Sequence, residues 1–340
     1  MDLLERLISA FAVSGNEEAV RKIIKEEIKD YVDDIYVDKL GNLLAHKKGK
    51  HPKIMLAAHM DEVGLMVKSI DPTGKIIFSI IGGIDHMMLL GERVHIQTPK
   101  AIMHGVITCR DVSNGEIISR VSSEEDLFVD TGLTKEELEK RGVEVGSYLS
   151  LERDLYFLGS KNIICGKAFD DRIGCYILIE LAKRLKSSKN EIYYVFTIQE
   201  EIGLVGAMTS TYKVQPDWAI AVDVTDTDDA SPNASKKLGE GPCITIKDEE
   251  TIGNKTINNW LLNVGKKRKI NIQKDVSDLG TTDAASISIT REGVPCTVVT
   301  VPIRNIHTTT GVANINDIKD TIRLLEGLLK KPPDTKVVWR

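Results

Sequence analysis

Two adjacent carboxylates, Glu200 and Glu201, end an apolar run that begins at Val195. Such a run is typical of a buried strand, and an unpaired carboxylate is costly to bury, so a positive charge is expected beside the pair. Neighbouring side chains in a strand point to opposite faces. The two glutamates are therefore predicted to perform two different tasks at one charged site.

Histidines and further carboxylates follow other predicted elements in the same way. These residues are His59 and Asp61 after the apolar run 54–58, Asp170 and Asp171 before a predicted helix, Asp223 after the run 218–222, and His307 beyond a strand that ends near Val301. Ligands of open α/β sheets bind at the carboxyl ends of the strands. We therefore expect these side chains to converge on one rim of a sheet.

Imidazole nitrogens and carboxylate oxygens are the ligands of zinc and similar divalent ions in hydrolytic sites. Three ligand carboxylates opposite two divalent cations leave a charge near +1, which a bridging hydroxide would neutralise. One of the tandem glutamates then remains as a general base. The spacing of His59 and Asp61 puts both on one strand face, where Asp61 can accept the second ring N–H of His59.

Each of these residues alone has a simpler explanation, because polar residues at strand ends are commonly caps or turn residues. Asp170-Asp171-Arg172 could form a helix N-cap with a local ion pair. The tandem glutamates could face solvent. The joint pattern, rather than any single residue, predicts the metal site.

Alternating helices and strands are predicted to position these residues. A capping-box pattern at Ser14-Gly15-Asn16-Glu17 predicts a helix that continues to about Asp30. Other helices are expected at 2–11, 171–185 and 315–330, and strands at 33–38, 42–47, 54–58, 192–199, 218–222 and 294–301. This order predicts an α/β fold with a mainly parallel mixed sheet that helices cover on both faces.

A change of pattern between residues 67 and 158 predicts a second unit. Short alternating segments, separated by turn residues, lie at 75–81, 93–97, 105–109 and 148–151, and a charged helical stretch is expected at 124–141. The pattern predicts a smaller β-rich, barrel-like domain that interrupts the α/β fold. The expected domains are therefore 1–66 with 159–340, and the insert 67–158.

Composition limits the environment and the partners. The formal net charge is -5, which disfavours binding to nucleic acid or to an anionic membrane, and the basic run 266–269 is expected to be the solvated end of a helix. Five scattered cysteines without a Cys-x-x-Cys pair favour reduced, buried thiols. With no signal peptide and no apolar run of membrane-spanning length, the chain is expected to be soluble and cytoplasmic. The other histidines are expected to be solvated (His46, His51), structural (His95, His104) or near a pocket (His86).

Three long motifs, in this order along the chain, resemble those of the tetrahedral (TET) aminopeptidases. They are Ala57-Ala58-His59-Met60-Asp61-Glu62-Val63-Gly64, Lys167-Ala168-Phe169-Asp170-Asp171-Arg172-Ile173-Gly174 and Gln199-Glu200-Glu201-Ile202-Gly203-Leu204-Val205-Gly206. That family comprises two-metal exopeptidases, some known as glutamyl or deblocking aminopeptidases and some named endoglucanases. The resemblance extends over essentially the whole chain, including the position of the β insert.

The resemblance implies a role for each site residue. It implies that Asp170 bridges two divalent ions, with zinc or cobalt expected, and that a cis peptide bond follows Asp170. Glu200 would take a proton from the metal-bound water, and Asp61 would orient a histidine ligand. The other implied ligands are His59 and Asp223 for one ion, and Glu201 and His307 for the other.

The resemblance also implies self-association. The insert corresponds to the dimerisation domain of the family, and dimers assemble there into hollow tetrahedral dodecamers that admit peptides. The chain departs from many relatives at His86-Met87, at 308–310 and in the acidic loop 225–229. These departures lie near the expected substrate pocket, so the preferred N-terminal residue stays open.

The expected function is a metal-dependent aminopeptidase that removes N-terminal amino acids from short peptides, using a metal-bound hydroxide and a glutamate general base. A glycoside hydrolase that uses paired carboxylates is the alternative. A third candidate is a metal-stabilised assembly protein without catalysis, but Glu200, an acid not needed as a ligand, argues against it.

Overall fold

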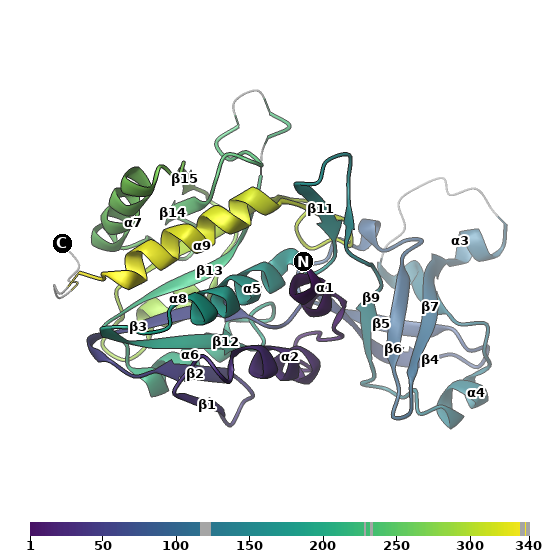
Figure 1. The fold of residues 1–340 in the computed structure, drawn as a ribbon. Coiled ribbons are helices and arrows are strands. Elements are labelled where there is room, and N and C mark those ends of the chain that lie inside the picture. The colour runs from purple at the N-terminus through teal and green to yellow at the C-terminus, as the bar shows by residue number, and fades with distance from the viewer. Residues whose placement is uncertain (116–123, 228, 232–233, 334–336, 338–340) are drawn as a thin grey trace.

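The structure, a computed structural model, describes residues 1–115, 124–227, 229–231, 234–333 and 337. One large mixed sheet and one closed barrel contain the strands of this part of the chain. Figure 1 shows the sheet sandwiched between helices, with the barrel beside it. No helix among the described residues has the length and apolarity of a membrane span.

The large sheet has the strand order β1-β2-β12-β3-β13-β16-β17-β11-β10, with β14 and β15 attached beside β16. Its central strands β12, β3, β13 and β16 are parallel, as predicted. These strands are nearly continuous apolar runs because both of their faces are covered. The bounds are β1 Asp34–Val37, β2 Leu43–Lys47, β3 Lys50–His59, β10 Tyr156–Phe157, β11 Ile163–Gly166, β12 Asn190–Thr197, β13 Trp218–Asp226, β14 Cys243–Lys247, β15 Gln273–Val276, β16 Cys296–Arg304 and β17 Gly311–Asn314.

Helices cover the two faces of this sheet (Figure 1). Helices α1, α2, α5 and α9 pack on one face around a large apolar core, and α6 and α8 bury a smaller core on the other. The bounds are α1 Asp2–Ser9, α2 Glu18–Ile28, α5 Phe169–Arg184, α6 Val205–Val214, α7 Lys255–Arg268, α8 Asp283–Ile289 and α9 Ile315–Lys330. The predicted α/β class with helices on both faces is confirmed.

The barrel closes in the order β4-β5-β8-β7-β6-β9, and β9 pairs with β4. Alternate side chains of its strands fill a separate apolar core. The bounds are β4 Gly64–Ile70, β5 Ile76–Ile81, β6 Arg93–Gln97, β7 Ile102–Cys109, β8 Leu127–Asp130 and β9 Tyr148–Leu151, with the short helices η1 His86–Met88, α3 Arg110–Ser113, η2 Glu124–Asp126 and α4 Lys135–Lys140. The predicted barrel-like unit is confirmed.

Two local predictions are wrong. The stretch 124–141 is not one helix, because Leu127–Asp130 forms strand β8 and only Lys135–Lys140 is α-helical. The sequence around Ser14 is not a capping box, since α2 begins at Glu18 and has no side-chain cap. The Ser14 hydroxyl instead donates to Asp61 at 2.6 Å. Tertiary partners override the local signals at both places.

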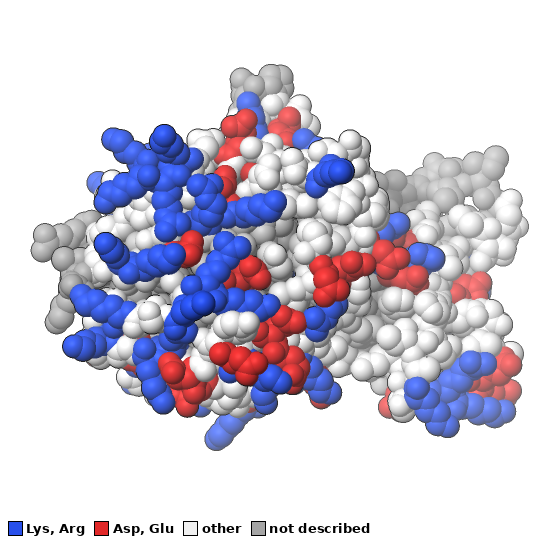
Figure 2. Space-filling view, in the orientation of Figure 1, with Lys and Arg blue, Asp and Glu red and all other residues white. Residues whose placement is uncertain are grey.

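The basic run 266–269 and the cysteines lie as expected, whereas His46, expected to be solvated, is only 14% exposed and stacks on Tyr193. The basic run occupies the last turn of α7, where positive charge complements the helix dipole. Figure 2 shows Lys and Arg concentrated on the sheet domain in this view, with acidic side chains among them. All five cysteines are buried and free, which confirms the predicted buried thiols. Asp228, in the acidic loop 225–229, lies outside the described residues.

Candidate metal centre

The carboxyl ends of the parallel strands bring the predicted residues together. His59 is the last residue of β3, and the tandem glutamates follow β12. Asp223 lies near the end of β13, and His307 lies three residues beyond β16. Asp170 joins them from the start of α5, at a non-helical position. The rim predicted from the sequence is therefore present, and it contains all of these side chains.

Asp170 lies between the two histidines. Its Oδ1 is 2.8 Å from Nε2 of His59, and its Oδ2 is 3.2 Å from Nε2 of His307. The bond between Asp170 and Asp171 is a cis peptide, as the family resemblance implied. Each carboxylate oxygen thus faces a different imidazole, which is the arrangement that a bridging ligand requires.

Main-chain carbonyls determine the tautomer of both histidines. Nδ1 of His59 is 3.2 Å from the carbonyl oxygen of Asp61, and Nδ1 of His307 is 3.1 Å from that of Gly83. A carbonyl only accepts, so each Nδ1 donates its proton to a carbonyl, and Nε2 is the ring nitrogen that faces Asp170 and is left to bind a metal. Such partners orient the histidine ligands of metal sites. The sequence did not indicate Gly83, which precedes η1 and brings the barrel unit to the site.

At this rim, two groups of side chains could each hold a metal ion. His59, Asp170 and Asp223 form one group, and Asp170, Glu201 and His307 form the other, with ligand atoms within 4.8 Å of one another in each. Asp170 belongs to both groups. A cluster of this composition fits two divalent ions that share one carboxylate.

Because these carboxylates are buried, their ionisation is unfavourable unless a cation lies beside them. Burial raises the pKa of Glu201 and of Asp223, and the charge of Asp170 adds to both shifts. Burial also opposes ionisation of Asp170, but hydrogen bonds from His307 and His59 lower its pKa below the usual range. Among the described residues, Oε1 of Glu201 is buried without a hydrogen-bond partner. A divalent cation would pair with such an atom, so the donor set fits a metal.

The tandem glutamates have different surroundings, although not for the predicted reason. Strand β12 ends at Thr197, so both glutamates lie in the following loop rather than on opposite strand faces. Oε2 of Glu201 is 3.3 Å from Nε2 of His307, whereas Oε2 of Glu200 is 3.9 Å from Nε2 of His59. Burial raises the pKa of Glu200 well above its ordinary value, although the charge of His59 lowers it. The pair thus faces two different histidines.

Asp61 contacts more of the site than the spacing predicted. Its carboxylate lies 3.5 Å from Nδ1 of His59, and its main-chain carbonyl is the closer partner of that ring. The carboxylate accepts the backbone N–H groups of Glu200 and Glu201 at 3.1 and 3.2 Å and the hydroxyl of Ser14. Asp61 therefore holds the loop of the tandem glutamates beside His59.

Several buried polar residues support the rim, although the sequence assigned them no role there. Lys167 donates to Glu62 at 2.8 Å and to Ser150 of the barrel at 2.7 Å. Arg172, for which a local ion pair was the alternative explanation, donates to main-chain carbonyls, including that of Met60 at 2.7 Å. These contacts join the motifs around the site to the barrel and to the N-terminal segment.

Asp283 is an acidic neighbour of the site that the sequence analysis missed. It lies at the start of α8, is buried, and accepts the hydroxyl proton of Thr197 at 2.6 Å. Burial raises its pKa to about 6. The sequence Thr281-Thr282-Asp283 gives only a helix-capping signal, because it does not reveal that α8 packs behind the rim.

A cleft opens beside the cluster. It is lined by Asp170, Glu200, Glu201, Asp223 and His307 together with Lys236 and residues of the loops 248–249 and 275–282. Its volume of about 880 Å³ is enough for a few amino-acid residues. Because acidic side chains predominate among the charged residues of its lining, the cleft favours the binding of a ligand that carries a cationic group.

Comparison with known proteins identifies the family. A family model described as M42 glutamyl aminopeptidase matches residues 41–324. The chain belongs to this family. It is therefore a hydrolase of the exopeptidase class, and the resemblance to TET aminopeptidases is confirmed.

Relatives match along their whole length. The lysyl aminopeptidase of Pyrococcus furiosus is 34% identical, covering 98% of both chains. An aminopeptidase structure from Desulfurococcus kamchatkensis has a TM-score of 0.93 and 34% identity, covering 98% of this chain and 95% of the other. The TET1 peptidase of Pyrococcus horikoshii has a TM-score of 0.89 and 30% identity over 97% and 99%, and it can assemble into a tetrahedron or a large octahedral shell.

Proposed function

We propose that this M42 family member is a metal-dependent aminopeptidase that removes N-terminal amino acids from short peptides. The observation that carries the proposal is the position of Asp170, whose two carboxylate oxygens face Nε2 of His59 and Nε2 of His307. In this proposal Asp170 would be a ligand of two divalent ions, zinc or cobalt. His59 and Asp223 would complete the ligands of one ion, and Glu201 and His307 those of the other.

Bound divalent ions would supply Lewis-acid polarisation of the scissile carbonyl and would lower the pKa of a water molecule in the cluster. Glu200 is the proposed general base, which accepts a proton from the attacking water and passes it to the leaving amine. Burial raises its pKa, which suits a group that must both gain and lose a proton. Asp61 acts as a positioning residue that fixes His59 and the backbone of Glu200.

The acidic cleft supports an exopeptidase rather than an endopeptidase reaction. A peptide with a free N-terminus carries an ammonium group, and the carboxylates of Glu200 and Asp223 line a wall of the cleft at 3.9 and 4.0 Å from Nε2 of His59. Attraction of the ammonium group to this wall would place the first peptide bond beside the cluster. The alternative, a glycoside hydrolase, needs only two carboxylates and gives no role to His59 or His307.

Metal removal tests the proposed function. Dialysis against a chelator is expected to abolish hydrolysis of an aminoacyl-anilide panel, because the carbonyl then lacks its Lewis acid. Added Zn²⁺ or Co²⁺ should restore the activity, and the rates measured with each metal would rank the candidates. Full activity on a glucan after metal removal would instead support the glycosidase.

We further propose that residues 1–66 and 159–340 form the catalytic domain and that the insert 67–158 mediates dimerisation. Six dimers would then form a dodecamer, a proposal supported by the tetrahedral assembly of the P. horikoshii relative. Light scattering is expected to give a particle of twelve times the mass of one chain, and deletion of the insert should prevent dimer formation. A monomer at micromolar concentration would contradict the proposal.

The cellular location is proposed to be the cytoplasm. Five buried, free cysteines support this proposal, because a reducing compartment keeps thiols unpaired. Recovery of the protein in the periplasmic or extracellular fraction of its cells would contradict it.

A further inference from the structure

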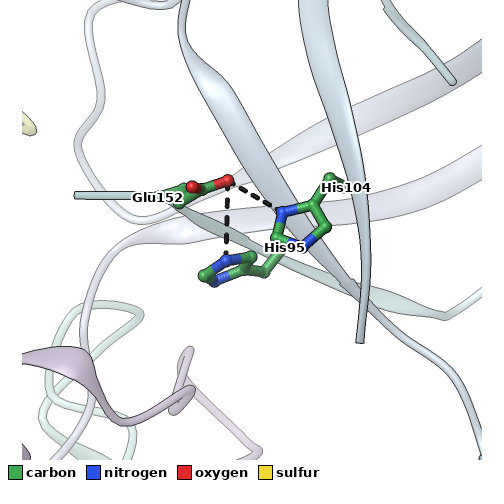
Figure 3. Close-up of side chains that lie close together, drawn as sticks. All are labelled: His95, His104 and Glu152. Carbon is green, nitrogen blue, oxygen red and sulfur yellow. Dashed lines mark hydrogen bonds and ion pairs between the residues drawn. The ribbon is translucent and has the colours of Figure 1, made fainter. Parts of the chain in front are cut away.

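A second cluster of metal-ligating side chains lies on the outer face of the barrel and shares no residue with the metal centre described above. It consists of His95 on β6, His104 on β7 and Glu152, which directly follows β9. Oε2 of Glu152 is 3.0 Å from Nδ1 of His104 and 3.5 Å from Nε2 of His95. Figure 3 shows both rings directed toward this carboxylate. Three segments of the chain thus converge on one point.

The barrel ladder holds the three residues in place. His95 and His104 are directly opposite partners in the antiparallel pair of β6 and β7, so their side chains lie on the same face. The next residues along β6 on either side, Val94 and Ile96, are buried in the barrel, which leaves His95 on its outside. The N–H of Glu152 donates to the carbonyl of Arg93 at 2.8 Å and fixes the third segment beside β6.

We propose that His95, His104 and Glu152 bind a divalent transition-metal ion of the zinc type. Two imidazoles and one carboxylate are a ligand set that zinc uses where a fourth position stays open. Ligands about 2.1 Å from a tetrahedral zinc ion lie roughly 3.4 Å apart. The distances of 3.0 and 3.5 Å from Oε2 of Glu152 to the two rings lie on either side of this value.

Arg93 completes the arrangement as a partner of the ligand carboxylate. Its guanidinium lies 3.3 Å from Oε1 of Glu152, the oxygen that the two histidines do not contact. This ion pair orients the carboxylate and leaves Oε2 for the metal. The side chain of His104 is 68% exposed, so an ion can enter from solvent and keep a water molecule as its fourth ligand.

The position of the cluster indicates a structural rather than a catalytic ion. His95 is paired in the ladder with Ser150, whose hydroxyl contacts the buried Lys167. A metal at the cluster would connect β6, β7 and the end of β9 beside the junction of the barrel with the rest of the chain. Such an ion stabilises the folded chain by mass action without taking part in hydrolysis.

Metal counting tests this proposal in the full-length protein. The wild type and His104→Ala, saturated with Zn²⁺ and freed of excess metal, are expected to differ by one zinc ion per chain in elemental analysis. Aminopeptidase activity should be unchanged, because His104 belongs to the barrel surface. His51→Ala is the matched control, because His51 is 77% exposed and lies 2.7 Å from Asp217 without a third ligand of this kind. It should retain the wild-type metal content.

The comparison does not depend on how many ions the main centre binds, because only the difference between variants is measured. Equal zinc content in the wild type and His104→Ala would overturn the proposal and leave Glu152 as an acceptor of two imidazole N–H groups. If His104→Ala does not fold, anomalous diffraction from zinc-soaked wild-type crystals decides the question. A peak between the two rings and Glu152 would support the site, and no peak there would refute it.

Discussion

Replacement of Glu200 by glutamine is expected to lower kcat by about 10²- to 10⁴-fold, the range that a positioned general base contributes. The glutamine amide has nearly the same shape, but it cannot accept a proton at neutral pH. Glu200 is buried and belongs to neither group of ligands, so the metal content should stay at the wild-type value. Steady-state rates on an aminoacyl-anilide and elemental analysis measure the two quantities.

A matched control separates proton transfer from a change of charge in the cleft. Glu249 lines the same cleft but lies outside both groups of ligands, so Glu249→Gln should keep a kcat close to that of the wild type. Loss of metal from Glu200→Gln would reassign Glu200 as a ligand. A fully active Glu200→Gln enzyme would remove the general base from the mechanism.

Much of the fold was predictable because its central strands are buried on both faces. The apolar runs at 54–58 and 218–222 are buried on both faces only in the middle of a sheet covered by helices. They form parts of β3 and β13. Local charge was misleading at 124–141. Leu127–Asp130 pairs with β7 and β5, and these partners are far away in the sequence. Pairing energy from distant strands overrides local propensity there.

The candidate site was predictable from the strand ends, but its supporting contacts were not. Polar residues that follow apolar runs identify the rim, because only a common ligand explains so many of them together. The carbonyl of Gly83 and the carboxylate of Asp283 reach the rim through the packing of η1 and α8. Neither residue is distinguished by type or spacing. The contacts of the Asp61 carboxylate also depend on a loop that was predicted to be a strand.

Replacement of Asp170 by asparagine is expected to have the largest effect on metal binding, because Asp170 alone is shared by both groups of ligands. The amide of asparagine is neutral and has only one oxygen atom. It therefore cannot contribute negative charge to two cations, and it cannot place an oxygen atom toward Nε2 of both His59 and His307. The variant should therefore lose both ions and show only background hydrolysis. Elemental analysis after dialysis, together with rates on an aminoacyl-anilide, measures the result.

Asp223→Asn provides the graded comparison, because Asp223 belongs to only one of the two groups. It is expected to lose one ion and to keep the ion held by Glu201 and His307, so its metal content should lie between those of Asp170→Asn and the wild type. Comparison of the unfolding temperature of each variant with that of the metal-free wild type shows whether the chain remains folded. If Asp170→Asn keeps both ions, or if both variants lose the same single ion, Asp170 is not a bridge. The two ions would then occupy independent sites rather than one shared centre.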